Sequence, residues 1–383
     1  MSEYQRYEFM TRDRPLTREQ LAAVNALSSH IDASSTHALI EYHWGDFKHD
    51  PIKVLREFFD GFLYWANWGA PRLALRFPHG ILPGDLIEGY DLDDDVAFKQ
   101  YSDYDILDIH FGELEGPDEW TEYDLGSLIG IREELMQGDR RALYIVWLAE
   151  QEALGSYDEE EEYEISVPAV PPGLSTLTAA EQALAELLQV PEELLVAAAR
   201  HSAKAAEATG KGTADDDLAA WVKLLPTEVR DAYLLRLARN EPGLSHLLAR
   251  ELRALGQGTS DAMTAPAGKR VTYATLRAEA SAIAERLERE KREQQRQDHL
   301  RHLREVYEER DSYWRQIEQA TERTTGARYE EAVRVLVELR EAAVHFNDSA
   351  AFEERFRAWV GPLLRRPALV KRLSDHGFSI PEL

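Results

Sequence analysis

Four side chains that could bind a metal ion lie within eight consecutive residues. In chain order they are His43, Asp46, His49 and Asp50, in the stretch YHWGDFKHD. Imidazole nitrogens and carboxylate oxygens are ligands that divalent cations accept in proteins. Asp50 is also expected to cap a helix that begins at Pro51, and for that reason we expect no tightly bound metal. The sequence leaves open a metal site at the first three side chains or a loop anchored by Trp44 and Phe47.

A second pair of candidate side chains lies on a predicted strand. Asp108 and His110 are two residues apart in LDIHF, where apolar and polar residues alternate. Alternation places both on one face, and a carboxylate beside an imidazole can orient it for general-base catalysis. Any strand with one solvated face has the same pattern, so both interpretations stay open. If the protein is an enzyme of unrecognised type, metal-dependent or not, its candidate catalytic residues are His43, Asp46, Asp108 and His110.

Other motifs depart from the patterns that their chemistry needs. The stretch GKGT at residues 210 to 213 resembles a phosphate-binding loop, but Ala205 and Gly212 stand where that motif requires Gly and Ser or Thr. His299 and His302 lie three residues apart on a charged helix, which fits solvent exposure as well as zinc binding. The sequence contains no G-x-S-x-G, H-E-x-x-H or G-x-G-x-x-G motif. We therefore expect no bound cofactor.

Composition indicates a folded protein of more than one unit. The 383 residues include 44% hydrophobic residues and no cysteine, which excludes disulfides, thiolate metal sites and cysteine nucleophiles. No stretch approaches the roughly 20 apolar residues that a membrane helix needs. The start MSEYQRYEF has no apolar run typical of an export signal. We expect a cytoplasmic protein with two or three folding units and no membrane partner.

The net charge of −26 is concentrated in one part of the chain. Residues 85 to 164 hold 26 Asp and Glu against 4 Lys and Arg, whereas the flanking parts are nearly balanced. A negative field attracts basic partners, and it also keeps a surface soluble without any partner. We predict a docking surface for a basic protein at eight acidic residues. They are Asp91, Asp93, Asp94, Asp95, Glu159, Glu160, Glu161 and Glu162.

Aromatic and basic residues interleave near the N-terminus, as in Tyr4, Arg6, Tyr7 and Phe9. Stacking on aromatic rings and neutralisation of phosphates are the contacts that bind nucleic acids. Residues 1 to 84 carry 10 acidic and 9 basic side chains, so their net charge does not favour phosphates. A core strand explains the same aromatic residues. An RNA- or DNA-binding accessory protein is therefore an alternative, with nucleic acid not expected on the acidic segment.

The N-terminal third alternates between strand and helix patterns. Aromatic or alternating stretches predict strands at residues 4 to 10, 36 to 44, 72 to 77 and 107 to 111. A capping box at Thr17 predicts a helix to about residue 27, and apolar residues at helical spacing predict another from Pro51 to about Trp68. This order predicts a small α/β sandwich, for which a ferredoxin-like topology fits, within a protein of the α+β class.

The remainder of the chain shows helical patterns interrupted by two linkers. An acidic, proline-rich linker follows the α/β domain, and a second linker is rich in Gly and Ala. We divide the chain into an α/β domain at 1–154, a linker at 155–176, a helical domain at 177–255, a linker at 256–270, and a helical region at 271–383.

The helical region at the C-terminal end predicts a long helical hairpin. Residues 274 to 322 contain neither Gly nor Pro, so they can form one helix, and Gly326 can turn the chain into a second helix at 328 to 346. Residues 288 to 299 contain no apolar side chain. Partial heptad spacing, as at Leu300, Tyr307 and Trp314, favours a coiled coil whose polar centre is exposed.

One resemblance to a known family is carried by the stretches YEFMTRDRPLTREQLAAVNALSS, YHWGDFKHDPIKVLREFFDGFLYWANWG and LALRFP. Over residues 4 to 78 the chain resembles an uncharacterised family of bacterial hypothetical proteins. The resemblance implies a bacterial cytoplasmic protein, and the family carries no assigned activity. We predict a non-enzymatic interaction, scaffold or accessory subunit of a multi-protein system.

Overall fold

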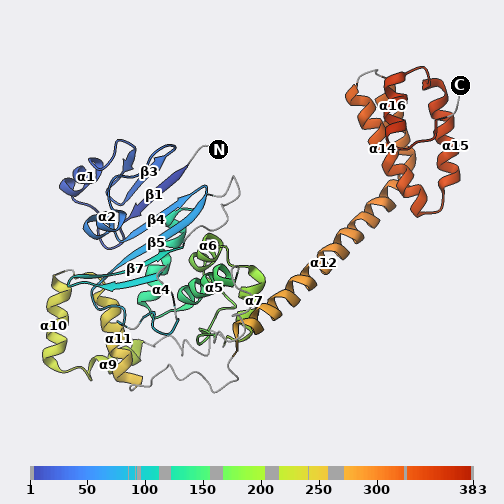
Figure 1. The fold of residues 1–383 in the computed structure, drawn as a ribbon. Coiled ribbons are helices and arrows are strands. Elements are labelled where there is room, and N and C mark those ends of the chain that lie inside the picture. The colour runs from blue at the N-terminus through green and yellow to red at the C-terminus, as the bar shows by residue number, and fades with distance from the viewer. Residues whose placement is uncertain are drawn as a thin grey trace. The chain divides into compact units, whose positions relative to one another are not determined.

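A computed structural model describes residues 4–84, 86–90, 92, 96–111, 122–155, 167–202, 215–239, 241–257, 271–322 and 326–380. The chain forms two compact units, residues 1–283 and residues 284–383 (Figure 1). The first unit combines a β-sheet with helices, and the described part of the second is helical. This arrangement confirms the predicted α+β class.

The described strands form one seven-stranded antiparallel sheet in the order β2-β3-β1-β4-β5-β7-β6. The strands are β1 (Gln5–Met10), β2 (Ile31–Ala33), β3 (His37–Tyr42), β4 (Gly61–Ala66), β5 (Gly69–Pro78), β6 (Val96–Gln100) and β7 (Tyr104–His110). The first four belong to a strand-helix-strand-strand-helix-strand order, and the hairpin β4–β5 continues the sheet to β7 and β6.

Two helices cover one face of this sheet at the end formed by its first four strands (Figure 1). Helix α1 (Arg18–Asn25) begins at the predicted capping box of Thr17, and α2 (Pro51–Phe58) begins after the cap of Asp50. Side chains of alternate strand positions, such as Phe9, Ile40 and Phe62, pack under these helices. Because strand side chains alternate between faces, the other half of each strand is left for a second core.

Helix α2 is shorter than the sequence predicted. The apolar spacing suggested a helix to about Trp68, but α2 ends at Phe58 and residues 61 to 66 form β4. Asp60 and Gly61 interrupt the helix, and the aromatic residues of FLYW favour a strand. A continuous run of apolar residues fits a strand that is buried on both faces as well as it fits a buried helix, and periodicity does not distinguish the two. The predicted extent of this helix was therefore wrong.

The second face of the sheet packs against a layer of helices. They are α3 (Leu125–Leu128), α4 (Gly130–Met136), α5 (Arg141–Gly155), α6 (Ala179–Leu187) and α7 (Glu192–Arg200). Leu75 and Leu107 of the sheet belong to the same buried cluster as Tyr144, Trp147 and Tyr273. Helices α6 and α7, which the sequence analysis placed in a separate helical domain, contribute Leu184 and other side chains to this cluster.

Buried charges join the sheet to α4. The Arg132 side chain is fully buried, donates to the Arg76 carbonyl at 2.7 Å and forms an ion pair with Asp13 at 2.8 Å. Asp60, also buried, accepts from Arg76 at 2.7 Å and from the amides of Arg12 and Asp13. Burial opposes ionisation of Asp60, but these donors outweigh it and hold its pKa below the usual value.

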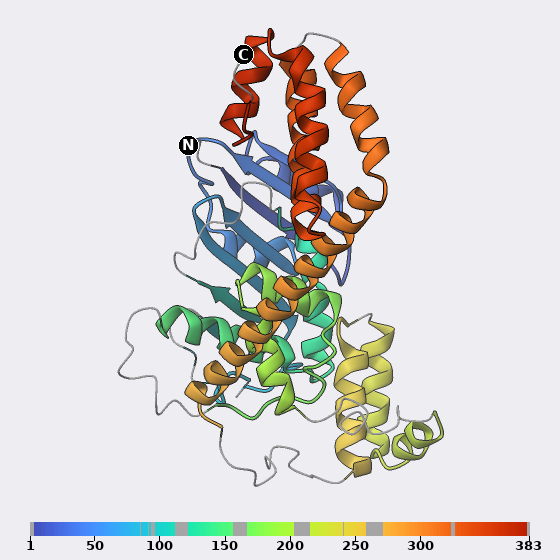
Figure 2. The ribbon, with the colours of Figure 1, turned by 90° about the vertical axis from the view of Figure 1, so that its right-hand side faces the viewer.

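Three further helices form a group in the first unit (Figure 2). They are α9 (Asp215–Val222), α10 (Thr227–Ala238) and α11 (Leu244–Gln257). Arg250 of α11 donates to the carbonyls of Gly80 and Ile81, which follow β5. Gly243 has a φ of +70° and lies so close to Ile81 that an added Cβ would be 2.0 Å from its Cδ1. A glycine is therefore required where this group meets the sheet.

The second unit begins within a long helix. Its elements are the C-terminal part of α12 (Tyr273–Glu308), α13 (Arg310–Glu322), α14 (Gly326–His345), α15 (Ser349–Val360), a 3-10 turn (Gly361–Leu363) and α16 (Pro367–Asp375). The helix predicted for residues 274 to 322 is interrupted at Glu309. Trp314, Leu336 and Phe356 lie in one buried cluster formed by these helices.

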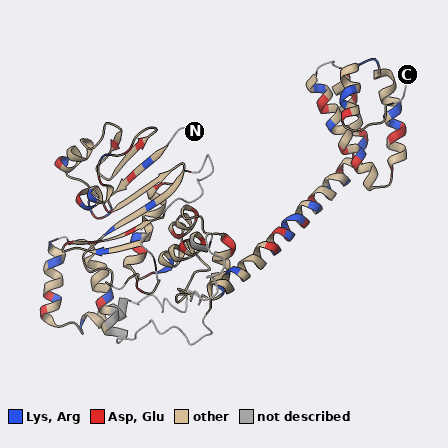
Figure 3. Ribbon diagram, in the orientation of Figure 1, with Lys and Arg blue, Asp and Glu red and all other residues tan. Residues whose placement is uncertain are grey.

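The polar part of α12 is exposed along its whole length. Each residue from 285 to 299 is exposed, which confirms that the apolar-free stretch 288 to 299 does not pack into a core. Figure 3 shows basic and acidic residues interspersed along this helix, and ion pairs such as Arg292 with Glu288 are one turn apart. Among the described residues, no helix combines the length and apolar character needed to cross a membrane.

Glu181 of α6 is a buried carboxylate whose ionisation should destabilise the fold. It accepts from the Thr178 amide at 2.8 Å, and its other oxygen lies 3.0 Å from Arg141 Nε without a hydrogen bond among the described residues. Its position 3.0 Å from a guanidinium suggests a stabilised charge, but the missing hydrogen bond and the full burial argue that desolvation dominates. Burial thus raises the pKa of Glu181 to about 7 from 4.5.

We expect Glu181→Gln to change how stability depends on pH. A carboxyl group whose pKa is higher in the folded state than in the unfolded state stabilises the fold at low pH. This stability is lost as the pH rises from the unfolded-state pKa of 4.5 to the folded-state pKa of about 7. Glutamine keeps the capping contact and carries no charge, so the variant should be more stable than the native chain above that range, by roughly 1 to 3 kcal/mol. Urea unfolding across pH measures this. The exposed Glu186→Gln on the same helix is the control, and an unchanged pH slope in Glu181→Gln would contradict the expectation.

Candidate functional site

The loop between β3 and α2 carries three of the predicted site residues and is mostly exposed. Phe47 is buried under α1 and α2, whereas Trp44 is 72% exposed. The expectation that both rings anchor the loop is therefore right for Phe47 and wrong for Trp44. Trp44 lies after the last paired residue of β3, so the alternation that buries strand side chains no longer applies to it.

The side chains of this loop contact different neighbours. The His43 ring lies 5.4 Å from the ring of Tyr4, and Asp46 accepts from Gln5 Nε2 at 2.9 Å. The ring of His49 packs beside the buried phenylalanine of the loop. Within the described ranges, no group of three or more His, Asp and Glu side chains is arranged to hold a metal ion.

Asp50 performs the structural role predicted for it. Its carboxylate accepts from the Ile52 amide at 2.9 Å, which confirms the cap of α2. Lys53 and Arg56 extend from the exposed side of the helix that Asp50 begins. The helix therefore places two cations on the surface, and Arg56 is the one next to the open part of the sheet.

Asp108 and His110 share a face of β7, but the carboxylate binds an arginine. Arg72 of β5 donates from Nε at 2.9 Å and from Nη2 at 2.7 Å to the two oxygens of Asp108. The side chains of both are partly exposed. His110 is exposed and pairs across the sheet with Arg72. The structure thus gives Asp108 the role of orienting a guanidinium, and this hydrogen bond raises the pKa of Arg72.

A hollow of about 280 Å³ lies beside this ion pair, where α2 no longer covers the sheet. Its lining comes from α2 and its cap, from β5, β6 and β7, and from the turn between β6 and β7. The lining residues are Asp50, Ile52, Arg56, Arg72, Ala97, Lys99, Tyr101, Ile106 and Asp108. Three cations and two carboxylates give the lining a net charge of +1, in a chain whose net charge is −26.

Two arginines of this hollow are held in place by neighbouring groups. The Arg56 guanidinium lies 4.8 Å from the ring centre of Tyr101 and 5.6 Å from that of Tyr104, and it donates to the Tyr104 hydroxyl. Arg72 is held by Asp108. Lys99 is exposed and forms no ion pair with any described residue. The arrangement can offer cationic donors to an anion without first ordering their side chains.

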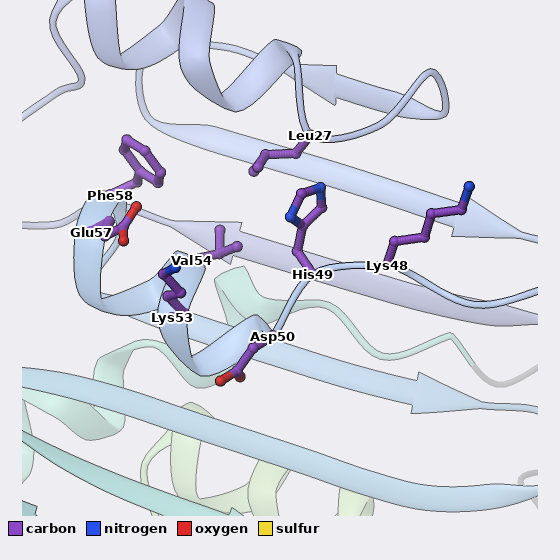
Figure 4. Close-up of a pocket in the computed structure, with 8 residues that line it drawn as sticks. All are labelled: Leu27, Lys48, His49, Asp50, Lys53, Val54, Glu57 and Phe58. Atoms are coloured by element: carbon purple, nitrogen blue, oxygen red, sulfur yellow. The ribbon is translucent and has the colours of Figure 1, made fainter.

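A second hollow of about 270 Å³ lies on the other side of α2. Figure 4 shows the ring of His49 directed toward Leu27, and Lys53 and Glu57 extending from α2. Lys48, which precedes His49 in the same loop, also lines it. Neither lysine has an ion-pair partner among the residues that the structure describes. Because flexible lysines provide its positive charge, this hollow is less organised for binding than the first.

The sheet brings together a histidine and an aspartate that no sequence pattern indicated. His79 Nδ1 lies 2.9 Å from the fully buried Asp105, whose other oxygen accepts from the Gly80 amide. The two residues are 26 positions apart, so only the pairing of β5 with β7 places them side by side. The contact fixes the turn that α11 binds, and the half-exposed imidazole keeps its second nitrogen for solvent.

Helix α10 exposes an apolar surface, which we name the leucine surface. Leu234, Leu235 and Leu237 are 59%, 60% and 63% exposed, and Leu224 in the preceding turn is 59% exposed. None of the residues of α10 is buried. Helical spacing places Leu234, Leu235 and Ala238 on one side, next to Asp231. No sequence signal distinguished these leucines, because the spacing of apolar residues in a helix does not show which of them pack against another element and which stay exposed.

The remaining predicted residues are either outside the described ranges or on exposed helix. All eight acidic residues of the predicted docking surface, and the stretch GKGT, lie outside the described residues. His299 and His302 of α12 lie 2.8 Å from Glu341 and 3.5 Å from Glu338 of α14. These contacts join two helices of the second unit, and each involves one histidine with one carboxylate.

The chain matches no known protein-family model, no curated protein and no solved structure. What the protein can bind follows from the geometry of its described residues. Two features of that geometry stand out, which are the leucine surface of α10 and the cationic hollow beside Arg72.

Proposed function

We propose that this protein is a non-enzymatic interaction protein, which serves as a scaffold or accessory subunit in a bacterial cytoplasmic multi-protein system. The observation that carries the proposal is the leucine surface. Large apolar side chains exposed together on a helix are typical of sites that bind another protein. A partner helix with its own apolar side is the simplest fit, since it can bury the leucines along the length of α10.

The surroundings of the leucine surface also support binding rather than core packing. The Tyr233 hydroxyl donates to Glu251, and Arg236 pairs with Glu241, so the inner side of α10 is already bonded to its own group. These contacts hold the helix without using the leucines. The leucines contribute little to the stability of the group, because most of their surface remains in water.

The candidate catalytic side chains have structural partners that are consistent with this proposal. Asp46 accepts a hydrogen bond from Gln5, and Asp108 orients Arg72. An interaction role for the acidic residues Asp91, Asp93, Asp94, Asp95 and Glu159 to Glu162 stays a prediction, because they lie outside the described residues. If it holds, a basic protein would bind there while an apolar one binds α10.

Two finer features of the fold belong to the proposal. A ferredoxin-like core is supported by the antiparallel order β2-β3-β1-β4 and by two helices on one face. A short coiled coil between α13 and α14 is supported by the packing of these two helices, which bury Trp314 and Ile317 of α13 with Leu336 and Leu339 of α14 in one cluster. Either feature would provide a rigid element from which a binding surface is presented.

Site-specific crosslinking tests the proposed function. A photo-reactive amino acid at position 235 should give a crosslink to another protein in the native host, while the same group at Arg289, exposed on α12, should not. Leu234→Gln with Leu237→Gln should abolish the crosslink and change the free energy of unfolding by less than about 1 kcal/mol. A variant that folds normally and crosslinks as well as the native chain would refute the role of the leucine surface.

A further inference from the structure

We propose that the hollow between α2 and the strands β5, β7 and β6 binds a small organic anion, which is a carboxylate or phosphate group attached to an apolar body. This inference is independent of the leucine surface and adds a ligand to the proposed interaction protein. It follows from three properties of the hollow, namely its charge, the way its cations are held, and the apolar residues between them.

The charge of the hollow is opposite to that of the chain. Arg56, Arg72 and Lys99 come from three different elements and line one hollow. One of the two carboxylates, Asp108, is already paired with Arg72. The other, Asp50, caps α2 and accepts a hydrogen bond from the Ile52 amide. Arg56 and Lys99 therefore have no carboxylate partner among the described residues. An anion bound there would supply one.

The fixed position of the arginines lowers the cost of binding. Immobilising a long side chain costs about 0.5 to 1.5 kcal/mol, and this cost has been met for Arg56 by the rings of Tyr101 and Tyr104. The Nε of Arg56 binds a hydroxyl, so its terminal nitrogens remain to donate to a planar oxyanion. Asp108 fixes Arg72 in the same way through a two-point contact.

The apolar part of the lining indicates the kind of molecule that carries the anion. Ala97 and Ile106 form part of the sheet between the cations, and Ile52 of α2 lies at the side. Ile106 is buried and forms the floor of the hollow, whereas Ile52 and Ala97 are partly exposed. An inorganic ion would leave the exposed surface of Ile52 and Ala97 in water, whereas an apolar body would cover it. Lys99 and Tyr101, which follow Ala97 along the chain, place a cation and a ring at the rim. A volume of about 280 Å³ suits a molecule no larger than a substituted ring or a short aliphatic chain.

Four small probes test the ligand class by ligand-observed NMR titration of the full chain. Benzoate should bind with millimolar affinity, while benzamide, which has the same body without charge, and acetate, which has the charge without the body, should each bind at least tenfold more weakly. Phenyl phosphate distinguishes a phosphate from a carboxylate as the preferred group. Benzamide or acetate binding as well as benzoate would overturn the proposal.

Matched variants assign the binding to the hollow. Arg56→Gln and Lys99→Gln should each weaken benzoate binding by at least threefold, and Lys53→Gln, on the same helix but lining the other hollow, should leave it unchanged. Equal weakening by all three would indicate a general charge effect and refute the site. A short single-stranded RNA that binds when benzoate does not, and that is lost in Arg56→Gln, would replace the small anion by a nucleic acid.

Discussion

Replacing Arg132 by Met is expected to cost about 3 to 5 kcal/mol of unfolding free energy, because removing one partner leaves buried charges unpaired. Arg132 is fully buried, and it binds the Arg76 carbonyl and Asp13. Methionine fills a similar volume but donates no hydrogen bond. Denaturant unfolding followed by fluorescence measures the loss, which should appear in the first unit.

A second arginine of the sheet serves as the control for this result. Arg72→Met removes a two-point contact with the Asp108 carboxylate, but both members of this ion pair reach solvent, so we expect a loss of about 1 kcal/mol or less. The variant at position 132 should also lose stability less steeply on acidification. Arg132 helps to lower the pKa of Asp60, and a depressed carboxyl pKa gives stability above its unfolded value that is lost as pH falls. Equal losses for both arginines would contradict the importance of burial.

Replacing Gly243 by Ala is expected to cost about 2 to 4 kcal/mol, from two separate causes. A residue with a Cβ at a φ of +70° is strained by about 1 to 2 kcal/mol. The new Cβ would also lie 2.0 Å from Ile81 Cδ1 and 3.0 Å from Pro78 Cγ, and such overpacking typically costs 1 to 3 kcal/mol. Hydrogen exchange of the α11 amides should increase, since this contact and Arg250 attach the α9–α11 group to the sheet.

Two further variants separate the causes at Gly243. Gly138 has a φ of +89° and no atom within 4 Å of an added Cβ, so Gly138→Ala should show only the cost of the backbone strain. Ile81→Val removes the atom that clashes, so combining it with Gly243→Ala should cost less than the sum of the two single changes. A strictly additive double variant would show that the close approach to Ile81 does not matter.

The sequence predicted features that depend on neighbours along the chain. The capping box at Thr17, the cap at Asp50 and the exposed centre of α12 all follow from side chains within one or two helical turns. The α+β class followed from the same local patterns. These predictions succeeded because hydrogen bonds at helix ends and the absence of apolar side chains act locally, whatever the rest of the chain does.

The length of α2 was wrong because FLYW fits either a helix or a buried strand, and only pairing with β1 and β5 decides between them. The role of Asp108 likewise depended on a residue 36 positions away, Arg72, which β5 brings opposite β7. Tertiary structure alone also brought Arg56 over the rings of Tyr101 and Tyr104 and left the leucines of α10 uncovered. Local patterns fix which elements form, whereas strand pairing and helix packing decide which side chains meet and which remain available to a ligand or a partner.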